Sequence, residues 1–167
     1  MRTYSDGQYV YSVDMMMSYV NLFPQKVETL PMSMFESVLE YKGWGTSSGK
    51  RYSPQDVLDN PKKYRSDIER INHADLKYPI FVYDTLVVDG FHRITRARMQ
   101  NKQYINAYIF TADTMRKFII IEGNNHNDVP PDIDIYITKF VKEFCAECTK
   151  KKLCGNSIKK VNIKGKK

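Results

Sequence analysis

The sequence is poor in the features on which secreted and membrane proteins depend. It contains three cysteines, three histidines and one tryptophan in 167 residues. A small, odd number of cysteines argues against a disulfide framework and for reduced thiols. The apolar run Phe118–Ile121 is far shorter than a membrane span, and no apolar signal segment follows Met1. We expect a soluble, cytoplasmic protein without a membrane partner, and association with a nucleus or nucleoid stays open.

Acidic residues are missing from the end of the chain. From Thr149 onward there are eight lysines and no acid, whereas the first 148 residues carry 18 basic and 19 acidic side chains. The net charge of +7 is therefore a property of the tail, and the nearly neutral body gives no general electrostatic reason to bind nucleic acid. DNA remains a candidate partner through this tail and through a local basic patch, Arg93–Lys102, that contains no acidic residue.

The size and the pattern of apolar residues predict one α+β domain. A chain of this length that is 42% hydrophobic can bury one core but not two full ones. We expect a small mixed sheet with helices packed on it over residues 1–122 and a helical extension over 123–155. A basic, disordered tail is expected over 156–167. Apolar residues at helical spacing from Asp132 to about Lys152 predict one long C-terminal amphipathic helix.

Local signals place the other elements. The Ser33–Glu36 pattern predicts a capping box that opens a helix ending before Gly43. Serine or asparagine followed by proline predicts two more helix starts, with the second helix running to about Asn72. These starts are Ser53-Pro54 and Asn60-Pro61. We expect one or two strands within Tyr9–Phe23, a hairpin of strands at 79–83 and 85–88, and a further strand at 104–110. Thr111 is expected to cap the helix or turn that follows this last strand.

One stretch carries the strongest signal for chemistry. The apolar run ending at Val88 stops at Asp89-Gly90, and a helical pattern follows, so we predict a strand, a tight turn and a helix. His92 and Arg93 then lie at a helix N-terminus, where free N–H groups and the helix dipole attract anions. We expect Gly90 to let a ligand approach the backbone and Arg93 to face solvent as a phosphate contact. The alternative is an ordinary turn with a solvated first helical turn.

The motif Asp89-Gly90-Phe91-His92-Arg93, followed by the strand at 104–110, resembles the nucleotide-binding core of the ParB/sulfiredoxin superfamily. The resemblance covers residues 78–110 well and 19–72 loosely. Members include sulfiredoxins, nucleotide-switched DNA-segregation proteins, nucleases and a kinase that phosphorylates free serine. Sulfiredoxins place their catalytic cysteine between the glycine and the histidine. Phe91 stands there, so peroxiredoxin repair is not expected.

The resemblance implies roles for individual residues. It implies that His92 and Arg93 contact nucleotide phosphates, and we add Gly90, the backbone amide of Phe91 and the neighbouring Arg96. ATP or another nucleoside triphosphate with Mg²⁺ is the expected cofactor. Asp89 is a candidate metal ligand or general base, and a helix cap is the equally weighted alternative. The serine-kinase branch has an upstream glutamate as base, for which Glu28 is the candidate, although spacing alone does not separate it from Glu36.

Two further features leave alternatives open. The Gly43–Gly49 loop with Trp44 either covers a ligand or folds Trp44 back as a plug. Three cysteines could supply three of the four ligands of a zinc site, with His126 as the fourth. The favoured interpretation is that the cysteines act as small buried apolar side chains. The cysteines are Cys145, Cys148 and Cys154.

Two functions from different classes follow from these residues. The first is a nucleotide-dependent phosphotransferase or nucleoside triphosphate hydrolase. The second is a DNA-associated ParB-like module or nuclease that uses the same turn together with the lysine-rich tail. The near-neutral body favours the first.

Overall fold

The computed structural model describes residues 2–45 and 49–123. Strands and helices are interspersed along this part of the chain, and the fold combines both, with a mixed sheet, as the sequence predicts. The described residues divide into two compact units, one of residues 2–19 with 116–123 and one within residues 20–115. The predicted C-terminal helix, the basic tail and all three cysteines lie outside the described residues. Within the described part, no helix is long and apolar enough to cross a bilayer.

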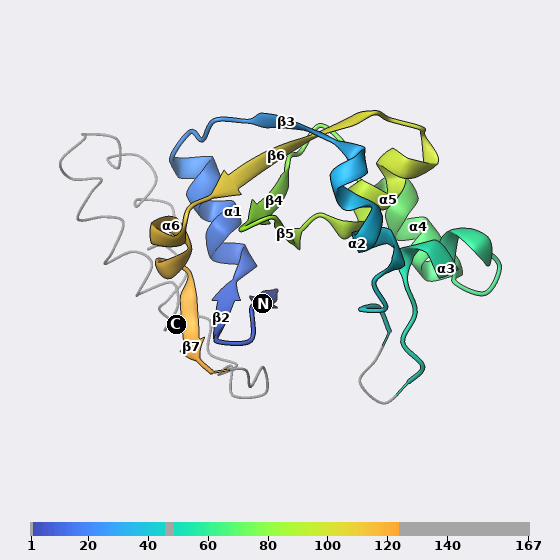
Figure 1. Ribbon diagram of the computed structural model, residues 1–167, viewed down its shortest axis with the longest axis horizontal. Helices are drawn as coiled ribbons and strands as arrows, with labels where there is room; N and C mark the ends of the chain where they lie inside the picture. Colours follow the sequence, from blue (N-terminus) through green and yellow to red (C-terminus); the bar gives the residue numbers. More distant parts are fainter. Residues whose placement is uncertain (1, 46–48, 124–167) are drawn as a thin grey trace, which may run out of the picture. The chain divides into compact units, whose positions relative to one another are not determined.

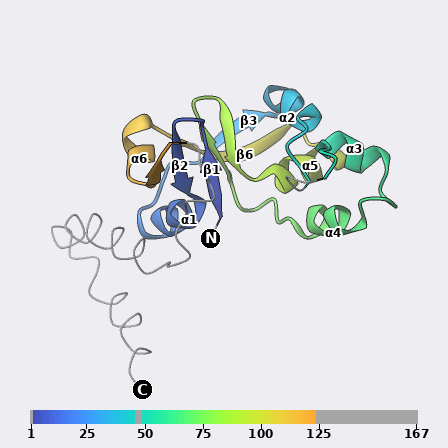
Figure 2. The ribbon, with the colours of Figure 1, turned by 90° about the horizontal axis from the view of Figure 1, so that it is seen from below.

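The first unit contains a three-stranded antiparallel sheet in the order β1-β2-β7. β1 spans Thr3–Ser5, β2 spans Tyr9–Ser12 and β7 spans Ile119–Glu122. β1 and β2 lie side by side in dark blue in Figure 2. The apolar run Phe118–Ile121 is thus mostly strand.

Of the one or two strands expected within Tyr9–Phe23, one is present, Tyr9–Ser12, and the expectation is wrong beyond Ser12. There the chain enters helix α1, Val13–Leu22. The Ser12 hydroxyl accepts the N–H of Met15 at 3.2 Å, which is the bond of a helix N-cap. Asp14 in the first turn complements the helix dipole. A local cap therefore overrides the β-forming composition of this segment.

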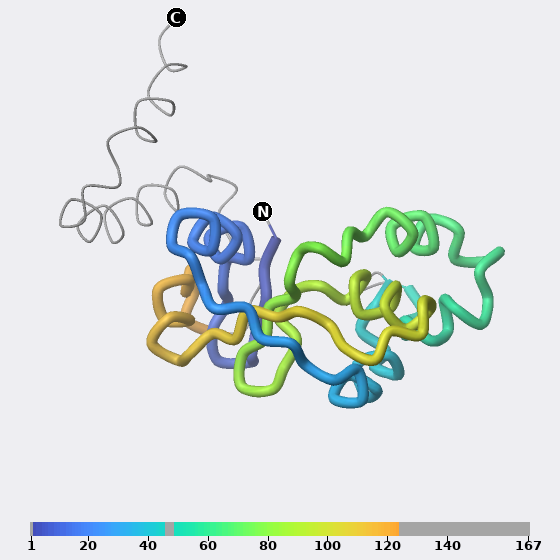
Figure 3. The backbone as a smooth tube through the Cα atoms, turned by 90° about the horizontal axis from the view of Figure 1, so that it is seen from above, coloured from blue at the N-terminus to red at the C-terminus, as the bar shows by residue number. Residues whose placement is uncertain are grey.

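The second unit is organised on a four-stranded sheet in the order β3-β6-β4-β5. β6, Tyr104–Phe110, pairs antiparallel with β3, Glu28–Pro31, and parallel with β4, Ile80–Tyr83. Figure 3 shows β3 in blue running alongside β6 in yellow. β4 and β5, Leu86–Asp89, form the predicted hairpin. Its two turn residues, Asp84 and Thr85, both have positive φ, as a tight type I′ hairpin turn requires.

Helices α2 to α5 gather at the end of this sheet where β5 passes into α5 (Figure 1). Their bounds are Glu36–Glu40 for α2, Pro54–Asp59 for α3, Arg65–His73 for α4 and Phe91–Met99 for α5, with a 3₁₀ turn at Met32–Phe35 before α2 and α6 at Ala112–Arg116. Ile94 and Ala97 of α5 pack on one face of the sheet against Ile80 and Ala107. This packing fixes where the N-terminus of α5 lies over the sheet.

The predicted helix N-termini are present in some places and absent in others. At Ser53 the capping box is present, since its hydroxyl accepts the Asp56 N–H and Asp56 accepts the Ser53 N–H. The predicted box at Ser33 is wrong, because the chain there is a 3₁₀ turn without a side-chain cap. The predicted start at Asn60-Pro61 is also wrong: those residues form a turn, and α4 begins after Tyr64. Thr111 accepts the N–H of Thr114 and opens α6, as expected.

Candidate phosphate-binding turn

The predicted strand, turn and helix are present, and Gly90 is the residue at which they join. Gly90 is the N-cap of α5, with φ 111°, a left-handed conformation that favours glycine. A Cβ built on Gly90 would lie 2.5 Å from Cγ2 of Ile80. The space that a side chain at Gly90 would occupy is filled by Ile80 of β4, so Gly90 also has a packing role, and the approach of a ligand to its backbone stays a prediction.

The first turn of α5 presents backbone donors. Ile94 donates to the Gly90 carbonyl at 3.0 Å and makes the first helical hydrogen bond. Within the described part of the chain, Gly90 supplies no side-chain cap and the N–H groups of Phe91 and His92 have no acceptor. Unsatisfied N–H groups at a helix start are the donors with which proteins bind phosphate. The Phe91 side chain packs against the core and leaves its backbone amide at the turn.

Arg93 does not face solvent as predicted. Its Nη2 donates to Asp89 Oδ2 at 2.6 Å, and the Arg93 side chain is only 14% exposed. Its Nε is buried and finds no hydrogen-bond partner within the described residues. A Cβ on Gly90 would be 3.1 Å from this Nε, so the guanidinium lies directly beside the turn. A buried guanidinium donor without an acceptor is costly and calls for a further partner.

His92 lies in the first helical turn under an aromatic side chain. The rings of His92 and Trp44 are 4.8 Å apart at 38°. Burial lowers the pKa of His92, with Asp67 opposing and Arg70 reinforcing the shift. The imidazole is therefore neutral at pH 7, when it can still donate one hydrogen bond. The sequence leaves two roles open for Trp44, a cover over a ligand and a plug folded back on the protein. Its contact with His92 matches the plug.

An aromatic cluster that the sequence did not indicate continues from Trp44. Tyr52 exchanges two backbone hydrogen bonds with Trp44 and stacks on Tyr64 at 4.4 Å. Its hydroxyl donates to Asp67 at 2.7 Å, which raises the pKa of Tyr52 to about 12. The residues come from three separate segments, and no local pattern connects them. Tyr52 also meets the Trp44 ring edge-on at 6.5 Å, so the cluster is connected to His92 through Trp44.

Arg96 is held away from the turn. Its Nη1 donates at 2.7 Å to the carbonyl of Ala74, the residue that ends α4. This bond satisfies a helix C-terminal carbonyl and ties α4 to α5. Two of the four charges of the predicted basic patch, those of Arg93 and Arg96, thus have partners within the protein.

Glu28 lies on the same sheet face as the turn but not in it. Glu28 pairs with Ala107, and Ala107 pairs with Ile80, on which Gly90 packs. Directly paired residues share a face, and two strand spacings place Glu28 roughly 10 Å from Ile80. Its carboxylate contacts Lys26 Nζ at 2.5 Å. Glu36, the other glutamate considered, is exposed at the start of α2.

Asp89 is the metal ligand that the sequence predicts at this turn. The described residues include no group of three histidine, cysteine, aspartate or glutamate side chains able to hold a metal ion. One Asp89 oxygen is already neutralised by Arg93. Mg²⁺ stays a prediction as an ion carried by nucleotide phosphates, which commonly supply several of its ligands. The question of zinc at the cysteines falls on residues outside the described part.

Comparisons with known proteins add no relative. No protein-family model matches this chain, and neither a curated protein nor a solved structure is significantly similar to it. The likeness to the ParB/sulfiredoxin superfamily consequently rests on the residues of the Asp89–Arg93 motif.

Proposed function

We propose that the protein binds a nucleoside triphosphate through its phosphates at the N-terminus of α5. The carrying observation is that, among the residues the structure describes, the buried Arg93 Nε has no acceptor, and neither do the first N–H groups of the helix start beside it. One phosphate oxygen at this place would accept from both kinds of donor. The Asp89 carboxylate would keep the guanidinium in position by accepting the hydrogen bond from Arg93 Nη2.

We further propose that the bound nucleotide serves phosphoryl transfer or hydrolysis. Glu28 supports this step because it lies on the same sheet face as the turn. The distance from Glu28 to Ile80, on which the turn packs, is roughly 10 Å, which a polyphosphate can span. It would accept the proton of a hydroxyl or water as that oxygen attacks the terminal phosphorus, while the bond to the leaving diphosphate oxygen breaks. Arg93 and the helix N-terminus would offset the charge on the transferred group.

The alternative, a DNA-associated module or nuclease, draws less support from these contacts. Arg93 and Arg96 donate to Asp89 and to the Ala74 carbonyl, so neither guanidinium is free to follow a DNA backbone. The location of the protein, in the cytoplasm or on a nucleoid, also remains a prediction.

Calorimetry with ATP, CTP and GTP in the presence of Mg²⁺ tests the binding step. The double variant Asp89→Asn with Arg93→Gln keeps a neutral hydrogen-bonding pair and should lose nucleotide affinity by about 1.5–3 kcal/mol. Arg98→Gln, which removes an exposed charge from the same helix, should bind normally. Absence of binding to the wild type by all three nucleotides would show that the turn is structural.

The catalytic step has a separate readout. Glu28→Gln should retain nucleotide affinity and lose phosphate release or transfer. Unchanged turnover in this variant would assign the base to another group, while leaving the binding proposal intact.

A further inference from the structure

Trp44 brings an aromatic ring to the first turn of α5. Its ring centroid lies 4.8 Å from that of His92, with 38° between the two ring planes. His92 therefore takes part in two groups of contacts. Its backbone N–H is one of the helix-start donors for which the described residues supply no acceptor, and its imidazole contacts the indole. A phosphate at the α5 N-terminus would thus lie one side chain away from the Trp44 ring.

The position of Trp44 is fixed by Tyr52. The two residues exchange backbone hydrogen bonds of 3.0 and 3.1 Å, and their rings meet edge-on at 6.5 Å. The Tyr52 hydroxyl donates to Asp67 of α4 at 2.7 Å, and the Tyr52 ring stacks on Tyr64 at 4.4 Å. The Asp67 side chain is only 14% exposed, so this anchor is largely buried. The indole is consequently held in place before a ligand binds, which reduces the entropy cost of binding.

The Trp44 ring is not enclosed by stacked rings. Among the described residues, His92 is the one ring that lies roughly parallel to the indole, since Tyr52 meets it at 81°. The Trp44 side chain is also partly exposed. A further planar group can therefore stack on the indole without displacing His92.

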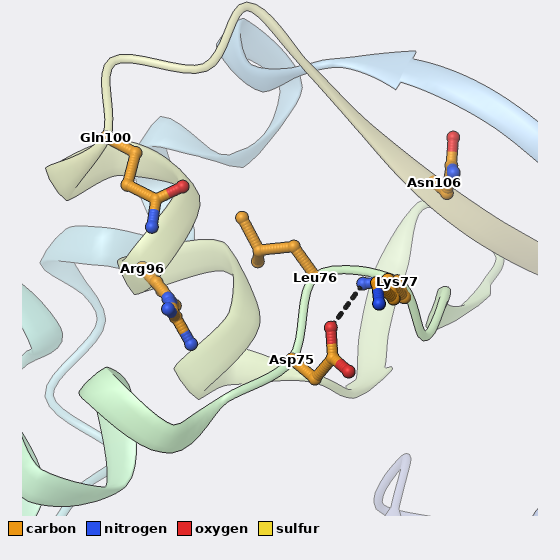
Figure 4. Close-up of a pocket in the computed structure, with 6 residues that line it drawn as sticks. All are labelled: Asp75, Leu76, Lys77, Arg96, Gln100 and Asn106. Atoms are coloured by element: carbon orange, nitrogen blue, oxygen red, sulfur yellow. Dashed lines mark hydrogen bonds between the residues drawn. The ribbon is translucent and has the colours of Figure 1, made fainter.

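A depression at the other end of α5 offers no such surface. It has a volume of about 560 Å³ and is formed by the segment after α4, the C-terminal half of α5 and β6 (Figure 4). None of the six lining side chains is aromatic, and the guanidinium of Arg96 already donates to the Ala74 carbonyl. The aromatic surface adjoining the proposed phosphate donors is on the Trp44 side.

We infer that Trp44 is the base-binding residue of the nucleotide site. The base stacks on the indole while the phosphates lie at the N-terminus of α5, so this inference rests on the function proposed above. Stacking requires only an aromatic face, which every base has, and larger rings stack over a larger area. The ligand class is therefore a nucleoside triphosphate with any of the common bases, with purines bound somewhat more tightly than pyrimidines.

Intrinsic fluorescence tests the stacking directly, because Trp44 is the only tryptophan in the chain. ATP with Mg²⁺ should quench the emission, since a stacked base accepts excitation energy or an electron from the indole. Tripolyphosphate with Mg²⁺ carries phosphates without a base and should bind without quenching. Both ligands are compared at about pH 8, where His92 is neutral and a change in its charge does not alter the emission.

Calorimetry on the full chain separates stacking from structural support. Trp44→Leu keeps an apolar side chain against His92 but removes the aromatic face, so ATP should bind about fivefold to a hundredfold more weakly. The affinity for tripolyphosphate should stay within about twofold, because phosphate contacts do not need the ring. Trp44→Phe retains an aromatic face and should keep most of the affinity for ATP.

Tyr104→Leu is the matched control. It makes the same change from an aromatic residue to leucine, and Tyr104 is 62% exposed. The neighbouring Ile105 packs in the core with residues of α5, so Tyr104 lies on the opposite face of the sheet. The affinities for ATP and for tripolyphosphate should both be unchanged.

The possible failures are distinguishable. Equal losses of ATP and tripolyphosphate affinity in Trp44→Leu would show that the ring only supports His92, which overturns the inference. It is also overturned by equal affinity of the wild type for the two ligands without quenching, or by selection of one base more than about a hundredfold over the others. These results leave the phosphate site intact. If the wild type binds neither ligand, the proposed function fails and the base site fails with it.

Discussion

Arg93 reaches back one helical turn to Asp89, and its Nη2 lies 2.6 Å from Asp89 Oδ2. The Arg93 and Asp89 side chains are 14% and 23% exposed, so solvent screens this ion pair only in part. The pair joins the last residue of β5 to the first turn of α5 and holds the strand-to-helix turn closed. Arg93 is therefore a structural residue as well as a candidate phosphate ligand.

Loss of Arg93 should destabilise the fold. Arg93→Gln leaves the half-buried Asp89 carboxylate without its charged partner, and the free energy of unfolding in urea should fall by about 1.5–3 kcal/mol. Addition of Asp89→Asn should restore part of the loss, with a coupling of about 0.5–3 kcal/mol in the double-mutant cycle. The control Arg98→Gln should change stability by less than about 0.5 kcal/mol. Additive effects of the two single changes would contradict a stabilising pair.

Gly90 should tolerate no side chain. Gly90→Ala forces a left-handed residue, at about 1–2 kcal/mol, and drives its Cβ into Ile80, at about 1–3 kcal/mol more. Gly7→Ala isolates the first effect, because Gly7 has φ 94° with nothing within 4 Å of the added Cβ. Thermal unfolding of both variants gives the difference. Equal destabilisation at the two sites would mean that Ile80 moves aside freely.

The two serine patterns should differ in their contribution to stability. Ser53→Ala removes a capping box that is present and should cost about 1 kcal/mol of unfolding free energy. Ser33→Ala removes an exposed serine that caps nothing and should change it by less than about 0.5 kcal/mol. Chemical denaturation of both variants measures this. A comparable loss at Ser33 would indicate a cap that the structure does not contain.

The elements that were predictable from the sequence are those determined by neighbouring residues. Asp89-Gly90 ends β5 and opens α5 because glycine adopts the required φ, and Ser53 with Asp56 closes its own capping box. The same kind of pattern failed at Asn60-Pro61. There Tyr64 stacks on Tyr52, and α4 starts after this tertiary contact.

The candidate site was likewise predictable only where neighbouring residues determine it. The order of residues along the Asp89–Arg93 motif indicated a helix start with donors, and that is present. The partners of its side chains come from elsewhere in the chain: Trp44 on His92, Ile80 on Gly90 and Ala74 on Arg96. Long-range contacts of this kind leave no periodicity or spacing in the sequence.

His92 should titrate below the ordinary histidine value of 6.5. Burial, in part under Trp44, lowers the pKa of His92 in the folded protein. At pH values between the pKa of His92 in the folded protein and 6.5, the unfolded chain binds more protons than the folded protein does. The contribution of His92 to stability is therefore full above about pH 6.5 and is lost as the pH drops through the pKa of the folded protein. His92→Gln should remove this part of the pH dependence, and Trp44→Ala should move the pKa back toward 6.5 because it uncovers the ring.

Nuclear magnetic resonance titration of the His92 ring measures this pKa directly, without and with nucleotide. A phosphate at the α5 N-terminus favours the imidazolium form, so the pKa of His92 should rise on binding and affinity should increase as the pH falls below 7. His92→Gln should bind with little pH dependence over the same range. A wild-type pKa at or above 6.5 without ligand would contradict the buried placement, whereas a low pKa that nucleotide leaves unmoved would separate His92 from the phosphate site.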